Sequence, residues 1–170
     1  FSVRDSAMHL EQMFERAKEL GAPAIALTDH GVLTGFFDFM KLGAKYEIKP
    51  IPGSEAYYVP DPEKDENKTR QHLILMAKDI EGYRGICEAV YRSYENTVTT
   101  PAGSFPRMTH KILVDCFGPE SEWHGHVIAT SACINGVLAQ LLLAKRNLEE
   151  GAKSLYDKRD KYHPIDAELL

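Results

Sequence analysis

Several side chains of this sequence have the chemistry of metal ligands, and they combine carboxylate, imidazole and thiol groups. In chain order they are Asp5, His30, Glu55, His72 and Cys133. A set of histidine, carboxylate and cysteine suits zinc, whereas carboxylate with imidazole also suits manganese or iron. Each residue taken alone more often packs in a core or faces solvent. A metal site therefore depends on whether the fold brings them together.

The segment 24–31, which reads Ala-Ile-Ala-Leu-Thr-Asp-His-Gly, is the most informative stretch of the chain. Its apolar first half predicts a buried strand over 24–28. The polar triplet then lies at the carboxyl end of this strand, where α/β folds place their chemistry. Asp29 and His30 are therefore candidate ligands, and Gly31 permits a sharp turn. A strand followed by an ordinary polar turn is the alternative.

The other candidate ligands with a predicted neighbouring strand follow the same pattern. Glu55 lies within the second strand, His72 opens the third, and Cys133 follows the fourth. Adjacent parallel strands would bring such side chains to one rim. His72 is at the wrong end of its strand for this arrangement, so we expect either an antiparallel strand or a different boundary.

Apolar periodicity and turn residues predict helices that alternate with strands. The expected strands are 24–28, 48–59, 72–77 and 127–131. The expected helices are 7–20 with Ser6 as its N-cap, 35–45, 81–94, 136–144 and 148–156, with 109–117 as a short helix or turn. The segments 60–70 and 97–106 are expected to be connections. This order implies an α/β fold with a mainly parallel sheet or barrel.

The composition is that of a globular domain of 170 residues, 44% of them hydrophobic, with a net charge of −5. The negative charge argues against a protein whose whole surface binds nucleic acid, and leaves a local basic patch open. The sequence has no apolar run that could span a membrane and no signal peptide. Its three cysteines are far apart and lack zinc-finger spacing, so we expect reduced thiols and a cytoplasmic location.

The remaining histidines are less convincing ligands. His124 and His126 form a His-x-His pair, which would put both imidazoles on one face of a strand. They precede the strand, in a charged loop, so a solvated loop is the favoured interpretation. His9 falls on the first helix, His110 begins the short helix, and His163 comes before a proline. None of these three is given a site role.

Five short segments, four of which contain a candidate ligand, form an ordered set of motifs. They are Thr-Asp-His-Gly at 28–31, Ile-Lys-Pro-Ile-Pro-Gly-Ser-Glu at 48–55, Gln-His-Leu-Ile-Leu-Met-Ala-Lys at 71–78 with Glu-Gly-Tyr-Arg at 81–84, and Ser-Ala-Cys at 131–133. The set resembles the PHP (polymerase and histidinol phosphatase) domain family. More narrowly, it is similar to the PHP domain at the amino terminus of bacterial DNA polymerase III α subunits of the DnaE type. The resemblance is strongest over 1–144 of a single 1–170 domain, and it leaves 145–170 as a helical tail.

The resemblance implies a distorted, seven-stranded, TIM-like β/α barrel with a metal cluster at its carboxyl rim. The complete family site holds up to three divalent ions, of zinc, manganese or iron. The matching ligand positions are Asp5, His30, Glu55, His72 and Cys133. His30 and Glu55 are the candidate catalytic residues among them. Asp29 would not bind the metal itself; it would orient a ligand imidazole or fix the turn.

The sequence also departs from the family pattern. The family opens with a His-x-His pair that would lie ahead of Phe1, and Asp5 is followed by Ser6 where the family usually has glycine. The closing aspartate and histidine of the family have no convincing match past Ala144. With its opening Phe1 and no initiating methionine, the sequence resembles a fragment. We therefore expect a barrel that is incomplete at both ends and fewer than three metal ions.

Three functions follow from the resemblance. The first is the PHP domain of a replicative DNA polymerase, with metal-dependent phosphoesterase or 3′–5′ exonuclease activity or a structural role. Its partners would be the DNA 3′ end and the remaining polymerase domains, without a membrane. The second is a stand-alone phosphatase of a small ester such as histidinol phosphate, against which the 81–84 segment counts. The third is a degenerate scaffold without catalysis.

Overall fold

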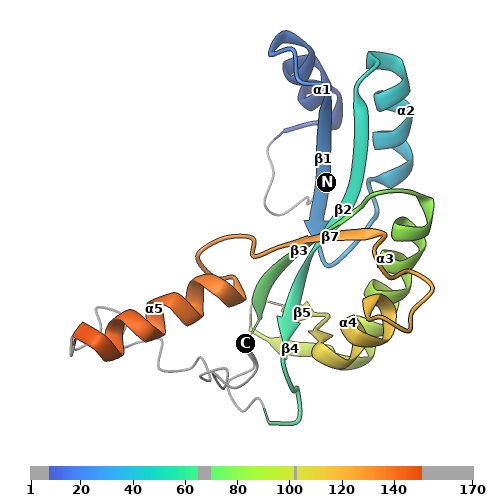
Figure 1. The fold of residues 1–170 in the computed structure, drawn as a ribbon. Coiled ribbons are helices and arrows are strands. Elements are labelled where there is room, and N and C mark those ends of the chain that lie inside the picture. Colours follow the sequence, from blue (N-terminus) through green and yellow to red (C-terminus); the bar gives the residue numbers. More distant parts are fainter. Residues whose placement is uncertain (1–7, 65–69, 102, 151–170) are drawn as a thin grey trace.

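The computed structural model describes residues 8–64, 70–101 and 103–150, in which helices and strands alternate over much of the chain. The helices are α1 (Leu10–Glu19), α2 (Phe36–Tyr46), α3 (Ile80–Ser93), α4 (His110–Phe117) and α5 (Val137–Glu150). The strands are β1 (Ala24–His30), β2 (Lys49–Val59), β3 (Gln71–Ala77), β4 (Val98–Thr100), β5 (Gly103–Phe105), β6 (Met108–Thr109) and β7 (Val127–Thr130). The protein is therefore a mixed α/β structure (Figure 1).

The main sheet has the strand order β1-β2-β3-β7, with β6 paired to β2, and β4 and β5 form a separate hairpin. Strand β2 is parallel to β1 and β6, whereas β3 is antiparallel to both β2 and β7. The expectation of a mainly parallel sheet is corrected by β3, and the antiparallel alternative raised for the strand of His72 is confirmed. Within the described residues the strands form these two sheets and not a closed seven-stranded barrel.

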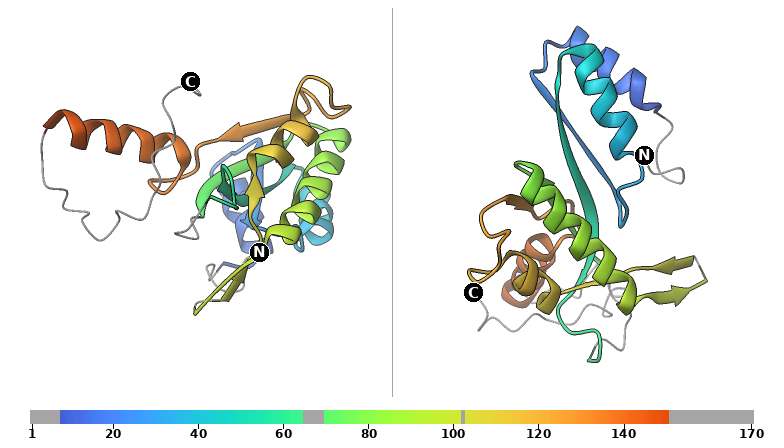
Figure 2. Two further views of the ribbon diagram at one scale, coloured as in Figure 1. Left: turned by 90° about the horizontal axis from the view of Figure 1, so that it is seen from below. Right: turned by 90° about the vertical axis from the view of Figure 1, so that its right-hand side faces the viewer.

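The two faces of the main sheet differ because successive side chains of a strand point in opposite directions. Leu27, Ala56 and Leu75 are buried and belong to the apolar clusters formed with α2 and α3. These two helices lie on the same side of the sheet (Figures 1 and 2). Odd sequence separations from these core residues place His30 and Glu55 on the opposite face.

Two apolar clusters hold the helices to the sheet. In the first, Phe14 of α1 and Phe39 of α2 are fully buried, with ring centroids 5.2 Å apart. In the second, Ile86 of α3 packs with Met108 and with Cys116 of α4. Burying a large apolar side chain stabilises the folded state by roughly 1.5–3 kcal/mol. Cys116 is itself buried in the second cluster, where it acts as a small core residue.

Helix boundaries follow the capping groups. Helix α1 begins at Leu10, where the Gln12 side chain accepts a hydrogen bond from the backbone of His9, so the prediction of a start at residue 7 is wrong. Ser6, its predicted cap, lies outside the described residues. Helix α3 is capped by Asp79, whose carboxylate accepts from Gly82 N at 3.0 Å. Its prediction is confirmed to within one residue at each end.

The chain after β7 differs from its prediction. Helix α5 runs without a break from Val137 to Glu150 and extends away from the sheet, in place of two helices over 136–144 and 148–156 (Figure 1). The part of the second predicted helix beyond residue 150, with the rest of the expected tail, lies outside the described residues. In the parts of the chain that the structure describes, every helix is too short or too polar to cross a bilayer.

Candidate metal centre

The carboxyl end of β1 positions the first candidate ligand. The strand continues to His30, two residues further than predicted, because Gly31 N donates to Glu55 O at 3.0 Å and extends the ladder. Gly31 then ends the strand with a φ of +66°, and a Cβ there would lie 3.0 Å from the ring of Pro106. His30 and Glu55 are direct partners in the parallel β1–β2 register, so both side chains point to the same face.

Glu55 lies between two imidazoles. Its Oε1 atom is 2.9 Å from Nδ1 of His72, and its Oε2 atom is 3.7 Å from Nδ1 of His30. The three side chains are 18–25% exposed, so they are shielded from bulk water without being closed off from it. The Nδ1 atom of His72 lies at hydrogen-bond distance from a carboxylate oxygen. A divalent cation could take the place of a proton shared between these two atoms.

The direction of β3 explains why His72 reaches this site. His72 is opposite Tyr57 in the antiparallel β2–β3 register, and Tyr57 is two residues beyond Glu55 on the same face. Because β3 runs antiparallel to β2, the start of β3 lies at the same edge of the sheet as the carboxyl end of β2. His72 therefore joins the end of β1, although it opens its own strand.

The loop after β7 brings the thiol. Cys133 Sγ lies 3.3 Å from Nδ1 of His72 and accepts from Asn135 N at 3.4 Å. The loop is fixed to β3 because His72 N donates to Asn135 O at 3.1 Å. Ala132 has a φ of +55°, a left-handed conformation that costs a non-glycine residue energy. The backbone is thus bent sharply one residue before the thiol.

Burial and charge act on His72 in a way that suits a ligand. Desolvation lowers its pKa, Glu55 acts in the opposite direction, and His30 and Arg70 lower it further. The net effect is a lowered pKa, which keeps the imidazole neutral at neutral pH. A neutral imidazole is the form that donates a nitrogen lone pair to a metal.

The donor set fits a divalent metal ion. One donor atom from each of Glu55, His72 and Cys133 lies within 4.8 Å of the others. Carboxylate, imidazole and thiolate are the ligand types of zinc sites, and a three-ligand site leaves a position for water or substrate. His30 stands beside this triad, with its ring centroid 5.6 Å from that of His72 and its Nδ1 atom facing the other carboxylate oxygen of Glu55.

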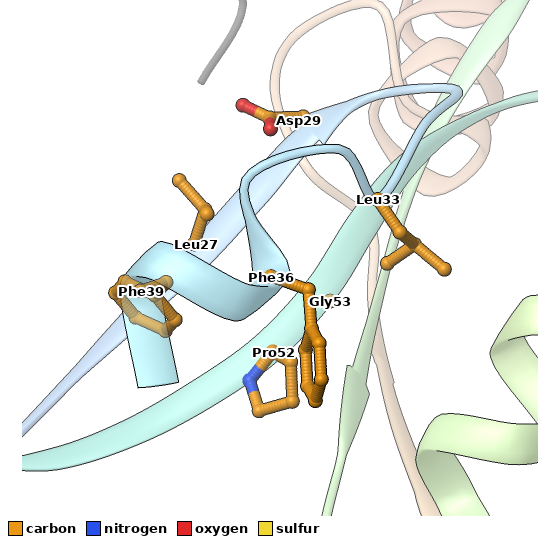
Figure 3. Close-up of a pocket in the computed structure, with 7 residues that line it drawn as sticks. All are labelled: Leu27, Asp29, Leu33, Phe36, Phe39, Pro52 and Gly53. Atoms are coloured by element: carbon orange, nitrogen blue, oxygen red, sulfur yellow. The ribbon is translucent and has the colours of Figure 1, made fainter. Parts of the chain in front are cut away.

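The other two predicted site residues differ from these four. Asp5 lies outside the described residues. Asp29 is 5% exposed and borders a small apolar pocket with Leu27 and Phe36, on the face of the sheet opposite to His30. Figure 3 shows its carboxyl group turned away from Phe36. Its main chain accepts a hydrogen bond from Ser54 Oγ at 3.1 Å, which ties β1 to β2 next to the ligands, and a role in fixing the turn stays a prediction.

Tyr57, for which the sequence predicted no role, contacts both histidines of the site with its ring. It stacks on His30 with a centroid distance of 5.6 Å and an interplanar angle of 4°. Its edge meets His72 at 5.8 Å. The signal was available in the strand alternation, because Tyr57 follows Glu55 by two residues. Its cross-strand partner could not be known without the register.

The His-Gly-His loop has structural partners. His124 donates to the carbonyl oxygen of Phe117 at 2.9 Å, and His126 lies 2.8 Å from the Asp79 carboxylate that caps α3. The loop is therefore held to α3 and α4, which pack on the other side of the sheet from the triad. These contacts agree with the interpretation of a loop.

Fold and site are those of a mixed α/β domain with a polar, metal-type ligand set on one sheet face. The PHP domain family matches residues 1–164, and the chain belongs to this family. The DNA polymerase III subunit alpha of Deinococcus radiodurans is 33% identical over 168 residues, which cover 92% of this chain and 12% of the relative. That of Chlamydia muridarum is 36% identical over 148 residues, covering 84% and 11% respectively.

A third relative, the DNA polymerase III subunit alpha of Helicobacter pylori, is 34% identical over 165 residues, which cover 95% of this chain and 13% of the relative. The chain thus spans roughly a tenth of the length of these curated relatives. The crystal structure of a proposed metal-dependent phosphoesterase from Bifidobacterium adolescentis aligns with 54% of this chain and 29% of its own. Its TM-score is 0.40 and its sequence identity 16%.

Proposed function

We propose that this chain is the PHP domain of a bacterial-type DNA polymerase III α subunit and hydrolyses phosphodiesters at the 3′ end of a DNA strand. The observation that carries the proposal is the convergence of Glu55, His72 and Cys133 within 4.8 Å, with His30 beside them. The family match and the polymerase relatives support the class of substrate. The remaining polymerase domains would then be its covalent neighbours.

Glu55, His72 and Cys133 would hold the metal ion, for which the thiolate and imidazole favour zinc over manganese or iron. Bound there, the metal would polarise a phosphoryl oxygen and lower the pKa of a water molecule. Glu55 would orient His72, whose Nδ1 atom lies 2.9 Å from its Oε1 atom, and it faces His30 with its other oxygen. Cys133 is exposed and Glu55 and His72 are partly exposed, so a strand end could approach the triad on its face of the sheet. In a complete barrel of the family type, this face would be the inner one.

Proton transfer in the proposed reaction involves His30. Its imidazole is close enough to Glu55 to accept a proton from the attacking water while the carboxylate stabilises the resulting positive charge. The water oxygen bonds to phosphorus, and the bond from phosphorus to the 3′-oxygen of the preceding nucleotide breaks. That oxygen takes up a proton from solvent, a nucleoside 5′-monophosphate leaves, and His30 returns its proton to solvent. His30 thus takes the catalytic role expected from the sequence as a proton acceptor beside the triad.

Metal content and DNA hydrolysis test this proposal together, in the full-length protein that contains this sequence. Glu55→Gln and Cys133→Ser should each lower metal occupancy, measured by inductively coupled plasma mass spectrometry, by more than about tenfold. Release of the 3′-terminal nucleotide from a single-stranded oligonucleotide should fall in parallel. Glu81→Gln is the matched control, because its carboxylate pairs with Arg84 on the surface of α3.

Two results would contradict the proposal. A folded protein that contains no metal and hydrolyses no DNA would identify the domain as a scaffold. Hydrolysis of histidinol phosphate without hydrolysis of DNA would instead support the small-ester phosphatase that the sequence left open.

A further inference from the structure

A continuous row of ring contacts leads from the metal centre to an arginine. Tyr57, which packs on both histidines, meets Phe105 edge to face with centroids 5.4 Å apart. The guanidinium of Arg70 lies over the Phe105 ring at 4.0 Å. Phe105 belongs to the β4–β5 hairpin, and Arg70 comes two residues before His72. The row therefore joins two segments that are far apart in the sequence.

Arg70 differs from the other arginines whose side chains the structure describes. Arg16, Arg84 and Arg92 pair with the carboxylates of Glu19, Glu81 and Asp115, and Arg107 donates to the Asn96 carbonyl oxygen. Arg70 has a cation–π contact and no carboxylate or hydrogen-bond acceptor among the described residues. A guanidinium that stacks on an aromatic ring keeps its donor edge available for an anion, and its planar fork matches phosphate.

The position of Arg70 indicates which anion it meets. Its guanidinium lies over Phe105, Phe105 meets Tyr57, and the Tyr57 ring lies 5.8 Å from that of His72, so these ring contacts place Arg70 on the side of the triad. Arg70 comes two residues before His72, and two residues of extended chain span roughly 6.6 Å. The two residues therefore lie close together at the start of β3. The chain as a whole is acidic, with a net charge of −5, so a cation beside the site that pairs with no carboxylate of the described residues is a local exception.

We propose that Arg70, held by Phe105, which itself packs on Tyr57, binds the phosphate of a DNA strand one nucleotide before the phosphodiester that is cleaved at the triad. The inference rests on the proposed function, and it names the preferred substrate: a strand with at least two successive phosphates. Arg70 is the binding residue, and Phe105 is a positioning residue that fixes the guanidinium plane.

A pair of dinucleotides isolates this contact. Thymidylyl-(3′→5′)-thymidine and the same compound with a 5′-phosphate share one identical cleavable linkage and differ only in the second phosphate. The full-length protein should hydrolyse the 5′-phosphorylated compound with a kcat/KM about tenfold to a hundredfold higher, the range of a charge-assisted hydrogen bond. Arg70→Ala should remove this ratio and leave hydrolysis of the unphosphorylated compound unchanged.

Further variants separate binding from structure. Phe105→Leu should reduce the ratio, and Arg70→Lys should keep only part of it, because a lysine keeps the charge and loses the fork. Arg84→Ala and Phe37→Ala are the matched controls, since both side chains are exposed on helices on the other sheet face, and they should keep the full ratio. Any general disturbance of the triad would change both compounds equally and cancel in the ratio.

The outcomes are distinguishable from those for the proposed function. If the unsubstituted protein hydrolyses both dinucleotides equally, or if Arg70→Ala keeps the ratio, the role of Arg70 is wrong and the hydrolytic function stands. If neither dinucleotide nor a longer oligonucleotide is hydrolysed by the metal-loaded protein, the proposed function fails and this inference fails with it.

Discussion

Glu55 has a central position because each of its oxygens faces a different histidine. Its place in the chain could be predicted from the sequence, as could the positions of His30, His72 and Cys133. The family resemblance implied that these side chains converge, but the strand pattern could not show how, because the contacts depend on the register of β3 and on the bend at Ala132. A strand pattern defines which face a side chain occupies, whereas its partner across the sheet is set by distant residues.

Asp79 and His126 show how similar residue types serve packing in place of chemistry. The Asp79 carboxylate caps α3 by accepting from Gly82 N and also bonds to His126. The backbone hydrogen bond is the main cause that lowers the pKa of Asp79 below its usual 3.8, and the bond to His126 is the next. A carboxylate and a histidine at hydrogen-bond distance here join a helix start to the loop that leads into β7.

Acid should weaken the fold partly through Asp79. Its pKa in the folded protein is below 3.8, so the unfolded chain binds the proton more readily. Stability is therefore fully present above pH 3.8 and is lost as the pH falls through the folded pKa. Urea unfolding of the metal-free protein from about pH 5 to about pH 2.5 should show a shallower loss for Asp79→Asn. An identical pH slope in the two proteins would refute this assignment.

At the scale of elements, the sequence predicts the type of most helices and strands and fails mainly at their ends. Strand β1 extends past its apolar run because Gly31 pairs with β2, and α1 starts late because His9 and Gln12 cap it. The segment 97–106, expected to be a connection, contains the β4–β5 hairpin. No apolar alternation marked this hairpin, so Phe105 and its contact with Tyr57 could not be anticipated.

The loop between β7 and α5 is the most constrained element of the site. Gly136 N donates to Cys133 O at 2.8 Å, and Gly136 forms a bridge with His72. A Cβ at Gly136 would lie 1.7 Å from the carbonyl oxygen of Ser131, a distance that no side chain can occupy. The close contact with the backbone of Ser131 therefore requires glycine here.

Gly136→Ala should displace this loop and with it the thiol of Cys133. We expect a loss of about 1–3 kcal/mol in the free energy of unfolding, as for other overpacked positions, together with weaker zinc binding in a competition titration. Gly125→Ala is the control, because Gly125 has a φ of +80° with open space around it. It should cost about 1–2 kcal/mol of backbone strain and leave zinc affinity unchanged. Normal zinc affinity in Gly136→Ala would show that the loop does not position the ligand.

At the scale of the whole molecule, the site connects parts that the two apolar clusters leave separate. One cluster holds α1 and α2 to β1, and the other holds α3 and α4 to β2 and β3. The triad residues come from β2, β3 and the loop after β7, and His30 comes from β1. A metal ion at the triad would therefore link the sheet across its width.

Zinc should stabilise the whole fold by mass action. At a free zinc concentration one hundred times the Kd, the free energy of unfolding should rise by about 2.7 kcal/mol. The increase should disappear in Cys133→Ser and after addition of a chelator. Urea unfolding with and without zinc measures this difference, and equal stability of the unsubstituted protein in both conditions would argue against a metal at the triad.

The pairing of β3 with β7 also bears on the order in which the chain folds. Ala77 pairs with Val127, fifty positions further on, whereas β2 and β3 are joined by a much shorter connection. Closing the longer loop costs more chain entropy, so contacts of this kind form late. The thiol of Cys133 should thus arrive after the carboxylate and the imidazole are already in place. During synthesis, the capture of a metal ion would mark the moment at which this domain completes its sheet.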